Sequence, residues 1–221
     1  MQKKIIELKD ITFSYDNARP LFKNFTFLLY ENEKVGLKGK TGAGKTTLLY
    51  LIMGFLKPKS GEIILFNKPR KKEEEFAEIR PKIGLLFQDP EIQLFCPTIK
   101  EDIAFGPLNL GIKREEVLEI IKDVSEFLGI SHLLERSVLQ LSGGEKKLCA
   151  LATVMAMKPL VYLLDEPTTG LDEVYKEKLY KFLKERAKTY LIVSHDEEFL
   201  NKTCEKIYYL EEGKLKLWKV S

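Results

Sequence analysis

The sequence predicts an α/β fold with a mostly parallel β-sheet, and two observations indicate it. Short apolar segments alternate with helical patterns in the second half of the chain, which is typical of a parallel sheet covered by helices on both faces. A glycine-rich loop around residue 40 also stands between a predicted strand and a predicted helix. The length of 221 residues suffices for one domain with its own hydrophobic core.

The first third of the chain is predicted to consist mainly of strands, which turn residues separate from one another. A helix is expected to begin at Lys45, directly after the glycine-rich loop. Strand-like patterns cover residues 5–13, 25–30, 35–38, 62–66 and 83–87.

The chain after residue 87 is predicted to be helical for roughly 70 residues. Apolar residues at helical spacing predict a helix over 113–128. Ser142, followed by Glu145 three positions later, forms a capping-box pattern that starts a second helix, which should end before Pro159. A strand over 160–164, a helix over 173–186, a strand over 190–193, a short helix after His195 and a hairpin of strands over 206–210 and 214–218 complete the prediction.

Composition and charge exclude several classes of protein. The 36 basic and 33 acidic residues leave a net charge of +3, which is too small and too scattered to indicate a nucleic-acid partner. The sequence contains neither a signal-peptide pattern nor an apolar stretch of membrane length. Its three cysteines are widely spaced and form no Cys-x-x-Cys pair, which predicts neither a disulfide framework nor a zinc site and favours a reducing cytoplasm.

The glycine-rich loop Gly39-Lys40-Thr41-Gly42-Ala43-Gly44-Lys45-Thr46, with Thr47 after it, matches the phosphate-loop pattern. Glycines allow successive backbone N–H groups to converge on phosphate oxygens at the positive end of a helix. Lys45 is expected to reach the β- and γ-phosphates, and the hydroxyl of Thr46 to hold Mg²⁺. The loop therefore predicts a site for a nucleoside triphosphate with its metal ion.

Three further strand ends are expected to bring polar side chains to the same site. Asp165 follows an apolar strand and can bind the metal, and Glu166 can activate a water as general base. Gln88 can orient water or contact Mg²⁺, and His195 follows the strand 190–193. A solvated strand end is the ordinary alternative for each of these residues when it is taken alone.

A second possible anion cradle lies about a hundred residues after the first, at Ser142-Gly143-Gly144-Glu145. A helix start of this kind offers backbone N–H groups and a hydroxyl to an anion. Ser-Gly-Gly before a helix is also commonly no more than a flexible cap, so the residues alone leave both interpretations open.

These motifs together resemble those of the ATP-binding cassette (ABC) ATPases, and the resemblance covers essentially the whole chain. The family pattern also includes Tyr15, Leu141 before the second cradle, and Gly170-Leu171-Asp172. The resemblance implies a phosphate-loop core and an antiparallel N-terminal β subdomain over 1–88 and 158–221. It also implies an inserted α-helical subdomain over 89–157, all within one domain, 1–221.

The resemblance also implies how the motifs act on ATP and Mg²⁺. Two such chains, alike or related, pair head to tail, so that Ser142 and Gly144, with their neighbours Gly143 and Glu145, grip the γ-phosphate held by the other chain. His195 would support the γ-phosphate and the attacking water, and Asp172 would link the two sites. Tyr15 would stack on adenine, although packing against the sheet is the ordinary role of such an aromatic residue.

The segment 87–111 is similar to that of the energy-coupling ATPases of energy-coupling factor importers, of the cobalt and nickel type or the vitamin type. In that resemblance the segment lines a groove for a helix of an integral membrane partner, and Phe95 and Pro97 would suit an amphipathic helix. The expected location is the cytoplasmic face of the cell membrane. Two alternatives stay open: a soluble ABC ATPase of translation or DNA maintenance, and the ATPase of another class of ABC transporter.

Overall fold

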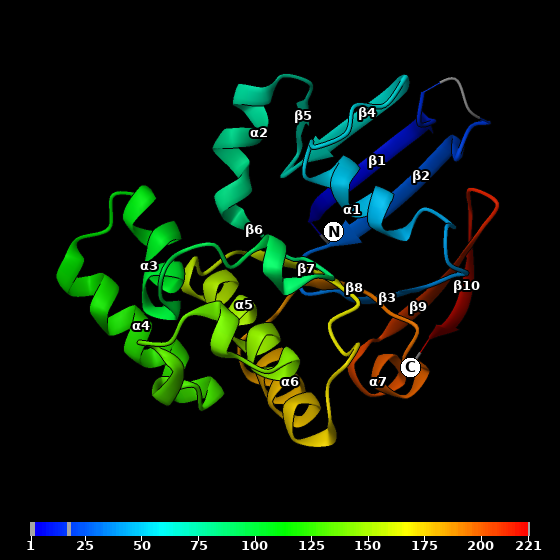
Figure 1. Ribbon diagram of the computed structural model, residues 1–221. Helices are drawn as coiled ribbons and strands as arrows, with labels where there is room; N and C mark the ends of the chain where they lie inside the picture. The colour runs from blue at the N-terminus through cyan, green and yellow to red at the C-terminus, as the bar shows by residue number, and fades with distance from the viewer. Residues whose placement is uncertain (1–2, 17–18, 221) are drawn as a thin grey trace.

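The computed structural model describes residues 3–16 and 19–220, and a six-stranded sheet is its central feature (Figure 1). The strands follow the order β10-β9-β3-β8-β7-β6. The five parallel strands are β9 (Lys206–Glu211), β3 (Lys34–Lys38), β8 (Tyr190–Val193), β7 (Val161–Asp165) and β6 (Ile83–Leu86). Strand β10 (Lys214–Val220) pairs antiparallel with β9 at the edge. The predicted parallel α/β sheet and its terminal hairpin are therefore confirmed.

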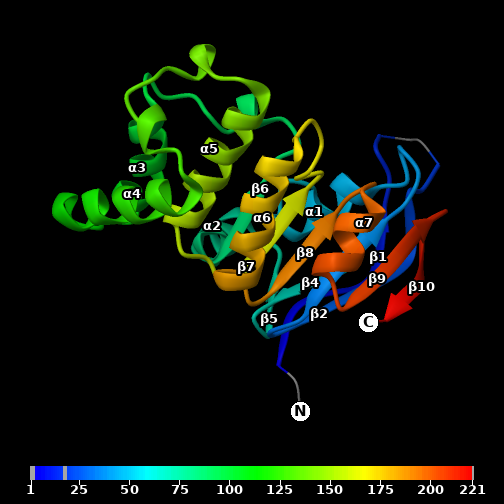
Figure 2. The ribbon, with the colours of Figure 1, turned by 90° about the horizontal axis from the view of Figure 1, so that it is seen from below.

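A second sheet of four antiparallel strands lies beside the first, in the order β2-β1-β4-β5 (Figures 1 and 2). Helix α1 (Lys45–Ile52) buries Leu48 and Leu49 in one core with Leu8 of β1 and Leu163 of β7, so it packs between the two sheets. The strands of the second sheet are β1 (Lys4–Phe13), β2 (Phe22–Tyr30), β4 (Ser60–Leu65) and β5 (Lys68–Arg70).

A second core lies on the opposite face of the six-stranded sheet, under helices α6 (Glu173–Glu185) and α7 (Glu197–Thr203). Successive residues of the central strands enter different cores: Leu163 packs in the first and Leu164 in the second, because side chains alternate along a strand. The second core continues into α3 (Ile99–Asn109), α4 (Arg114–Leu128) and α5 (Gly143–Ala156). These three helices fall within the range 89–157 assigned to the inserted subdomain, whose boundaries stay a prediction.

Helix α5 begins where its capping box predicts. The Ser142 hydroxyl accepts a hydrogen bond from the backbone N–H of Glu145 (3.3 Å), and the Glu145 carboxylate accepts one from the backbone N–H of Ser142 (2.8 Å). These two bonds satisfy N–H groups that have no partner within the helix. The start of the second cradle is thus fixed by hydrogen bonds between its own residues.

The structure departs from the sequence prediction in a few elements, and the others agree within one or two residues. Strand β2 begins at Phe22 instead of residue 25, because Phe22 pairs with Phe13 of β1 and is fully buried. The prediction missed β5 and α2 (Glu73–Ile79), and it did not separate α3 as a helix of its own within the helical segment after residue 87. Each of these is short or interrupts its helical pattern: α2 opens with three glutamates, and α3 contains Pro107.

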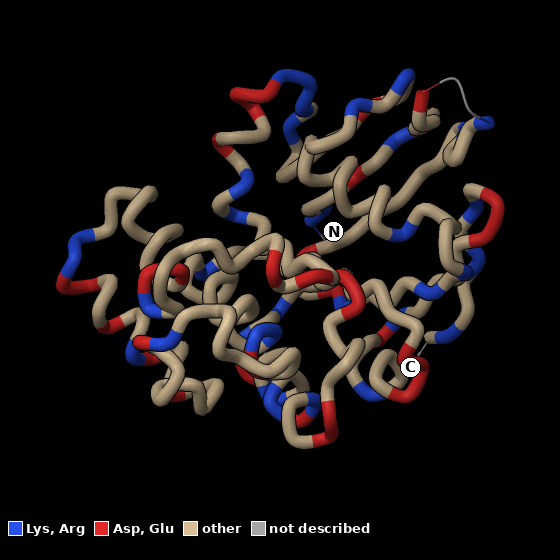
Figure 3. Tube along the Cα trace, viewed as in Figure 1, with Lys and Arg blue, Asp and Glu red and all other residues tan. Residues whose placement is uncertain are grey.

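Acidic and basic residues are interspersed along the trace, as Figure 3 shows. Helices α2 and α4 both carry acidic residues in their first turn, which favour the positive end of a helix dipole. Within residues 3–16 and 19–220, no helix combines the length and the apolar character needed to cross a membrane.

Gly84 of β6 provides a test of how closely α5 packs on the sheet. A Cβ atom at this position would lie 2.5 Å from Cγ1 of Val154 on α5 and 2.8 Å from Cγ of Pro159. We expect Gly84→Ala to lower the free energy of unfolding by about 1–3 kcal/mol through overpacking, as measured by urea denaturation. Gly143→Ala is the control, because a Cβ atom at that position would have nothing within 4 Å; equal losses in both variants would contradict the packing argument.

Candidate functional site

The carboxyl ends of the parallel strands meet at one edge of the six-stranded sheet, where they surround a cavity of about 500 Å³. Most of the site residues predicted from the sequence line this cavity, together with two residues that the prediction missed, Leu21 and Thr169. Neither has a motif of its own, so only the fold reveals them. The predicted residues that line it are Tyr15, Thr41, Gly42, Gly44, Lys45, Thr46, Thr47, Gln88, Asp165, Glu166 and His195.

The glycine-rich loop adopts a conformation that needs its glycines. Gly42 and Gly44 have φ angles of 78° and 101°, in the left-handed region that other residues rarely adopt. Gly39 is needed for a different reason: a Cβ there would lie 2.6 Å from the carbonyl oxygen of Leu210 on β9. Lys40 and Ala43 complete the loop, which leads into the first turn of α1.

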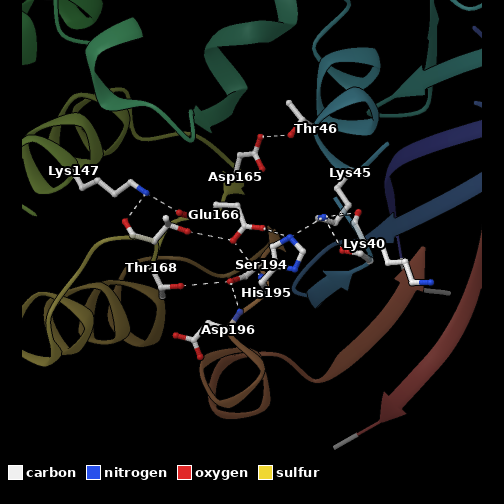
Figure 4. Close-up of polar contacts among 12 residues, drawn as sticks. Lys40, Lys45, Thr46, Lys147, Asp165, Glu166, Thr168, Ser194, His195 and Asp196 are labelled. Carbon is white, nitrogen blue, oxygen red and sulfur yellow. Dashed lines mark hydrogen bonds and ion pairs between the residues drawn. The ribbon is translucent and has the colours of Figure 1, made fainter. Parts of the chain in front are cut away.

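The ammonium of Lys45 lies inside the loop. Its Nζ donates hydrogen bonds to the carbonyl oxygens of Gly39 (2.8 Å) and Lys40 (3.2 Å) and lies 3.2 Å from Nε2 of His195 (Figure 4). Burial lowers the pKa of Lys45, while the nearby Glu166 and Asp165 carboxylates act in the opposite direction. The loop therefore presents a largely desolvated positive charge, which favours binding of a polyanion.

Asp165, the last residue of β7, offers an unsatisfied oxygen to the site. Thr46 Oγ1 donates a hydrogen bond to Asp165 Oδ2 at 2.7 Å, whereas the buried Oδ1 has no hydrogen-bond partner in the described structure. Burial raises the pKa of Asp165, and the hydrogen bond from Thr46 opposes that shift. A carboxylate oxygen beside a hydroxyl, with the Gln88 side chain on the same cavity wall, is the oxygen donor set that Mg²⁺ prefers.

Glu166 follows in an unusual backbone conformation, with a φ angle of 45°. Its N–H donates to the carbonyl of Val193 (2.8 Å), which ties it to the end of β8. Its carboxylate accepts a bond from the backbone N–H of His195 (3.2 Å), and its Oε1 lies 3.3 Å from His195 Nε2. The strained turn therefore aims a buried carboxylate at the imidazole and at the cavity.

Tyr15 also lines the cavity. Its hydroxyl is 3.0 Å from Thr47 Oγ1, and its ring packs edge-on against Phe13 with ring centroids 5.0 Å apart. The side chain is still 50% exposed. The contact with Phe13 is the sheet packing that the sequence offered as the ordinary role, and stacking on a base stays a prediction.

The second cradle does not join the first within one chain. Ser142, Gly144, Glu145 and Asp172 are absent from the lining of the 500 Å³ cavity. Gly143 lines a neighbouring cavity of about 530 Å³, which also contacts Thr46, Gln88 and Asp165. Asp172 caps helix α6 by accepting a hydrogen bond from the N–H of Tyr175 (3.0 Å). These residues have roles in helix starts here and are not gathered around Lys45.

Comparisons with known proteins agree with this geometry. The family model described as ABC transporter matches residues 22–169, more than half of the chain. The energy-coupling factor transporter ATP-binding protein EcfA of Methanothermobacter thermautotrophicus is 40% identical over 215 residues, which cover 96% of this chain and 69% of the relative.

Two solved structures share the whole fold. CbiO1 of Clostridium perfringens, described as part of the ABC transporter complex cbiONQ, aligns with a TM-score of 0.86 and 31% identity over 98% of this chain and 88% of its own. A dimeric ATP-binding cassette in a post-hydrolysis state, bound to ADP and Pi, aligns with a TM-score of 0.85 and 28% identity over 98% and 99%.

Asp165→Asn tests the unsatisfied buried carboxylate. In EDTA and without nucleotide, we expect the free energy of unfolding of the variant to exceed that of the wild-type chain by about 1 kcal/mol at neutral pH, because the substitution removes a buried charge. Burial raises the folded-state pKa of Asp165 above its unfolded value of about 4, so the wild-type chain gains stability as the pH falls through the folded-state pKa.

The advantage of Asp165→Asn should therefore shrink with acidification and vanish below about pH 4, as urea denaturation across pH would measure. Asp172→Asn is the matched control, because Asn caps a helix about as well as Asp. A variant less stable than the wild-type chain at neutral pH would contradict the interpretation.

Proposed function

Because this chain belongs to the ABC transporter family of ATPases, we propose that it is the ATP-hydrolysing subunit of a membrane importer. In this role it pairs with a second ATPase chain around two ATP molecules and couples their binding and hydrolysis to integral membrane partners. The observation that supports the proposal best is the single cavity where the phosphate loop, Asp165, Glu166 and His195 meet.

The proposed roles follow from the position of each group around that cavity. Backbone N–H groups of the loop and the Lys45 ammonium bind the β- and γ-phosphates. Thr46, Asp165 and Gln88 hold Mg²⁺, which when bound neutralises charge on the phosphate oxygens. Tyr15, which lines the same cavity, stacks on the adenine.

Hydrolysis is proposed to begin when Glu166 accepts a proton from a water molecule. The water oxygen then bonds to the γ-phosphorus as the bond from that phosphorus to the β–γ bridging oxygen breaks, which yields ADP and phosphate. His195 contacts both Glu166 Oε1 (3.3 Å) and Lys45 Nζ (3.2 Å), so its imidazole lies beside the proposed base and the phosphate-binding ammonium and can support the γ-phosphate and the water. The hydrogen bond of the Glu166 N–H to Val193 of β8 and the bond of its carboxylate to the His195 N–H hold the base in this orientation.

The second cradle is proposed to act in a partner chain. Ser142 and Gly143 are exposed and lie outside the cavity that holds Lys45, so they are accessible to the γ-phosphate of another chain. Gly144 and Glu145 support them from the first turn of α5, and Asp172, the N-cap of α6, is proposed to link the two sites. The dimeric ATP-binding cassette with ADP and Pi is a relative in which two such chains do assemble.

A groove on the helical side is proposed to receive a helix of the membrane partner. Phe95 and Phe105 border a cavity of about 220 Å³, and their rings meet edge-on with centroids 4.9 Å apart. Both rings are largely exposed, at 63% and 49%, which suits an apolar contact with another protein. Pro97, also expected in the groove, is exposed but outside its lining.

The names of the relatives support the finer proposal about the transporter. EcfA carries the name of an energy-coupling factor transporter, and CbiO1 is described as part of a transporter complex. We propose a peripheral location on the cytoplasmic face of the membrane and uptake of a metal ion or a vitamin.

Glu166→Gln tests the proposed base and the pairing together. We expect ATP binding to persist, turnover to fall by about 100- to 10,000-fold, and an ATP-bound dimer to accumulate, which light scattering would detect. Glu177→Gln, a surface change on α6, should behave like the wild-type chain. If Glu166→Gln stayed monomeric at saturating ATP, the second cradle would not act between like chains.

Phe105→Asp tests the groove. We expect the tagged chain to lose at least about tenfold of its detergent-stable association with transmembrane proteins, because an aromatic side chain proposed to be buried in the complex is replaced by a charge. ATP hydrolysis by the isolated chain should stay unchanged. Leu217→Asp changes an exposed leucine on β10, at the opposite edge of the sheet from β6, whose residues line the groove, and is the control. The importer proposal fails if no transmembrane protein co-purifies with the wild-type chain.

A further inference from the structure

Lys147 carries a buried ammonium group that the proposed chemistry leaves unused. It lies on α5, five residues after Ser142, and is only 6% exposed. Its Nζ donates hydrogen bonds to the backbone carbonyl oxygens of Glu166 (2.7 Å) and Thr169 (3.1 Å), as Figure 4 shows for Glu166. The side chain thus connects the helix of the second cradle with the loop of the proposed base.

Burying the Lys147 ammonium in this way costs folding free energy, so a contribution to stability alone does not account for the residue. Burial lowers the pKa of Lys147, although the carboxylates of Glu166, Asp165 and Asp89 act against that shift. Within the described ranges Lys147 forms no ion pair, so two neutral carbonyl groups are its direct partners. A buried charge without a counter-ion is generally less stabilising than an apolar side chain of similar volume.

The two carbonyl groups belong to a turn that positions the base. The N–H of Thr169 donates to the carbonyl of Glu166 (3.2 Å), which closes the turn, and Lys147 binds the same carbonyl from outside. Glu166 is held in the left-handed region within that turn. A shift of the ammonium would therefore act directly on the strained residue whose carboxylate faces His195.

Helix α5 is attached to a second segment near the site as well. Lys146 forms an ion pair with Glu91, and the amide of Gln93 donates to Ala150 O (3.0 Å) and Thr153 Oγ1 (2.7 Å). Beside these contacts, the 530 Å³ cavity lies between the start of α5 and the residues Thr46 and Asp165. Across this cavity, Lys147 is the side chain that joins α5 to the base.

We propose that Lys147 is a positioning residue that links the second cradle to the alignment of Glu166 in the same chain. The inference rests on the proposed function, in which the cradle binds ATP held by the partner and Glu166 acts on ATP held by its own chain. When the cradle binds the ATP held by the partner chain, the rate at which Glu166 hydrolyses the ATP of its own chain then changes. The two ATP sites of a pair are coupled through each chain, in addition to any contact between the chains.

The test is steady-state ATP hydrolysis by the full-length chain, with Lys147→Met compared with Lys146→Met on the same helix. Lys147→Met keeps the apolar stem and removes the donors. We expect its kcat to fall about 10- to 100-fold while KM changes less than about threefold, and its Hill coefficient to drop from above one toward one. Lys147→Arg, which retains a cationic donor, should restore most of the rate and the cooperativity.

Several outcomes would overturn the inference. They are a wild-type Hill coefficient of one, a normal rate and cooperativity in Lys147→Met, equal losses in Lys146→Met, or a lower kcat with unchanged cooperativity. ATP affinity, measured with a fluorescent analogue, shows whether Lys147→Met is folded; Lys147→Gln, which keeps one donor, replaces it if it is not. Dimer formation by Glu166→Gln separates the two proposals: without that dimer the proposed pairing of like chains fails, and with it only the role of Lys147 is at stake.

Discussion

The arrangement of buried charge at the carboxyl edge of the parallel sheet is the constraint on which the rest of the structure depends. Asp165, Glu166, Lys45 and Lys147 are each at most 8% exposed, yet within the described residues no ion pair joins one of these carboxylates to one of these ammonium groups. Backbone carbonyls, Thr46 and His195 partner them instead. Direct neutralisation would leave little attraction for a phosphate group, so the backbone must hold the charges apart.

The sequence predicted the parts of this edge that depend on local patterns. The phosphate loop, the apolar strands and the capping box at Ser142 each lie in a short stretch, and each was found where expected. Leu21 and Thr169 could not be found in this way, because they reach the cavity only through the packing of distant segments. Helix α2 was missed because its seven residues begin with three glutamates and show too little apolar periodicity.

The two cradles differ in how complete they are within one chain. The first is complete within one chain, since Lys45, Asp165, Glu166 and His195 surround one cavity. The second is an exposed helix start with its own capping bonds. Its Gly143 lines a neighbouring cavity with Thr46, Gln88 and Asp165, but no residue of the second cradle lines the cavity that holds Lys45. Lys147 of α5 donates hydrogen bonds to the turn 166–169, so this turn connects the helix of the second cradle with the residues of the first.

The alternation of β7 and β8 between two hydrophobic cores restricts where this molecule can bend. A shift of either strand by one residue would exchange the contents of both cores at once, because Leu163 and Leu191 face one core, and Leu164 and Ile192 face the other. The strands therefore cannot slide. The chain joins α3, α4 and α5 to the sheet through residues 87–98 and 157–160, so a movement of these helices relative to the sheet has to be absorbed there. Glu166 stays with the sheet in such a movement, because it follows β7 directly and its N–H donates to the carbonyl of Val193 at the end of β8.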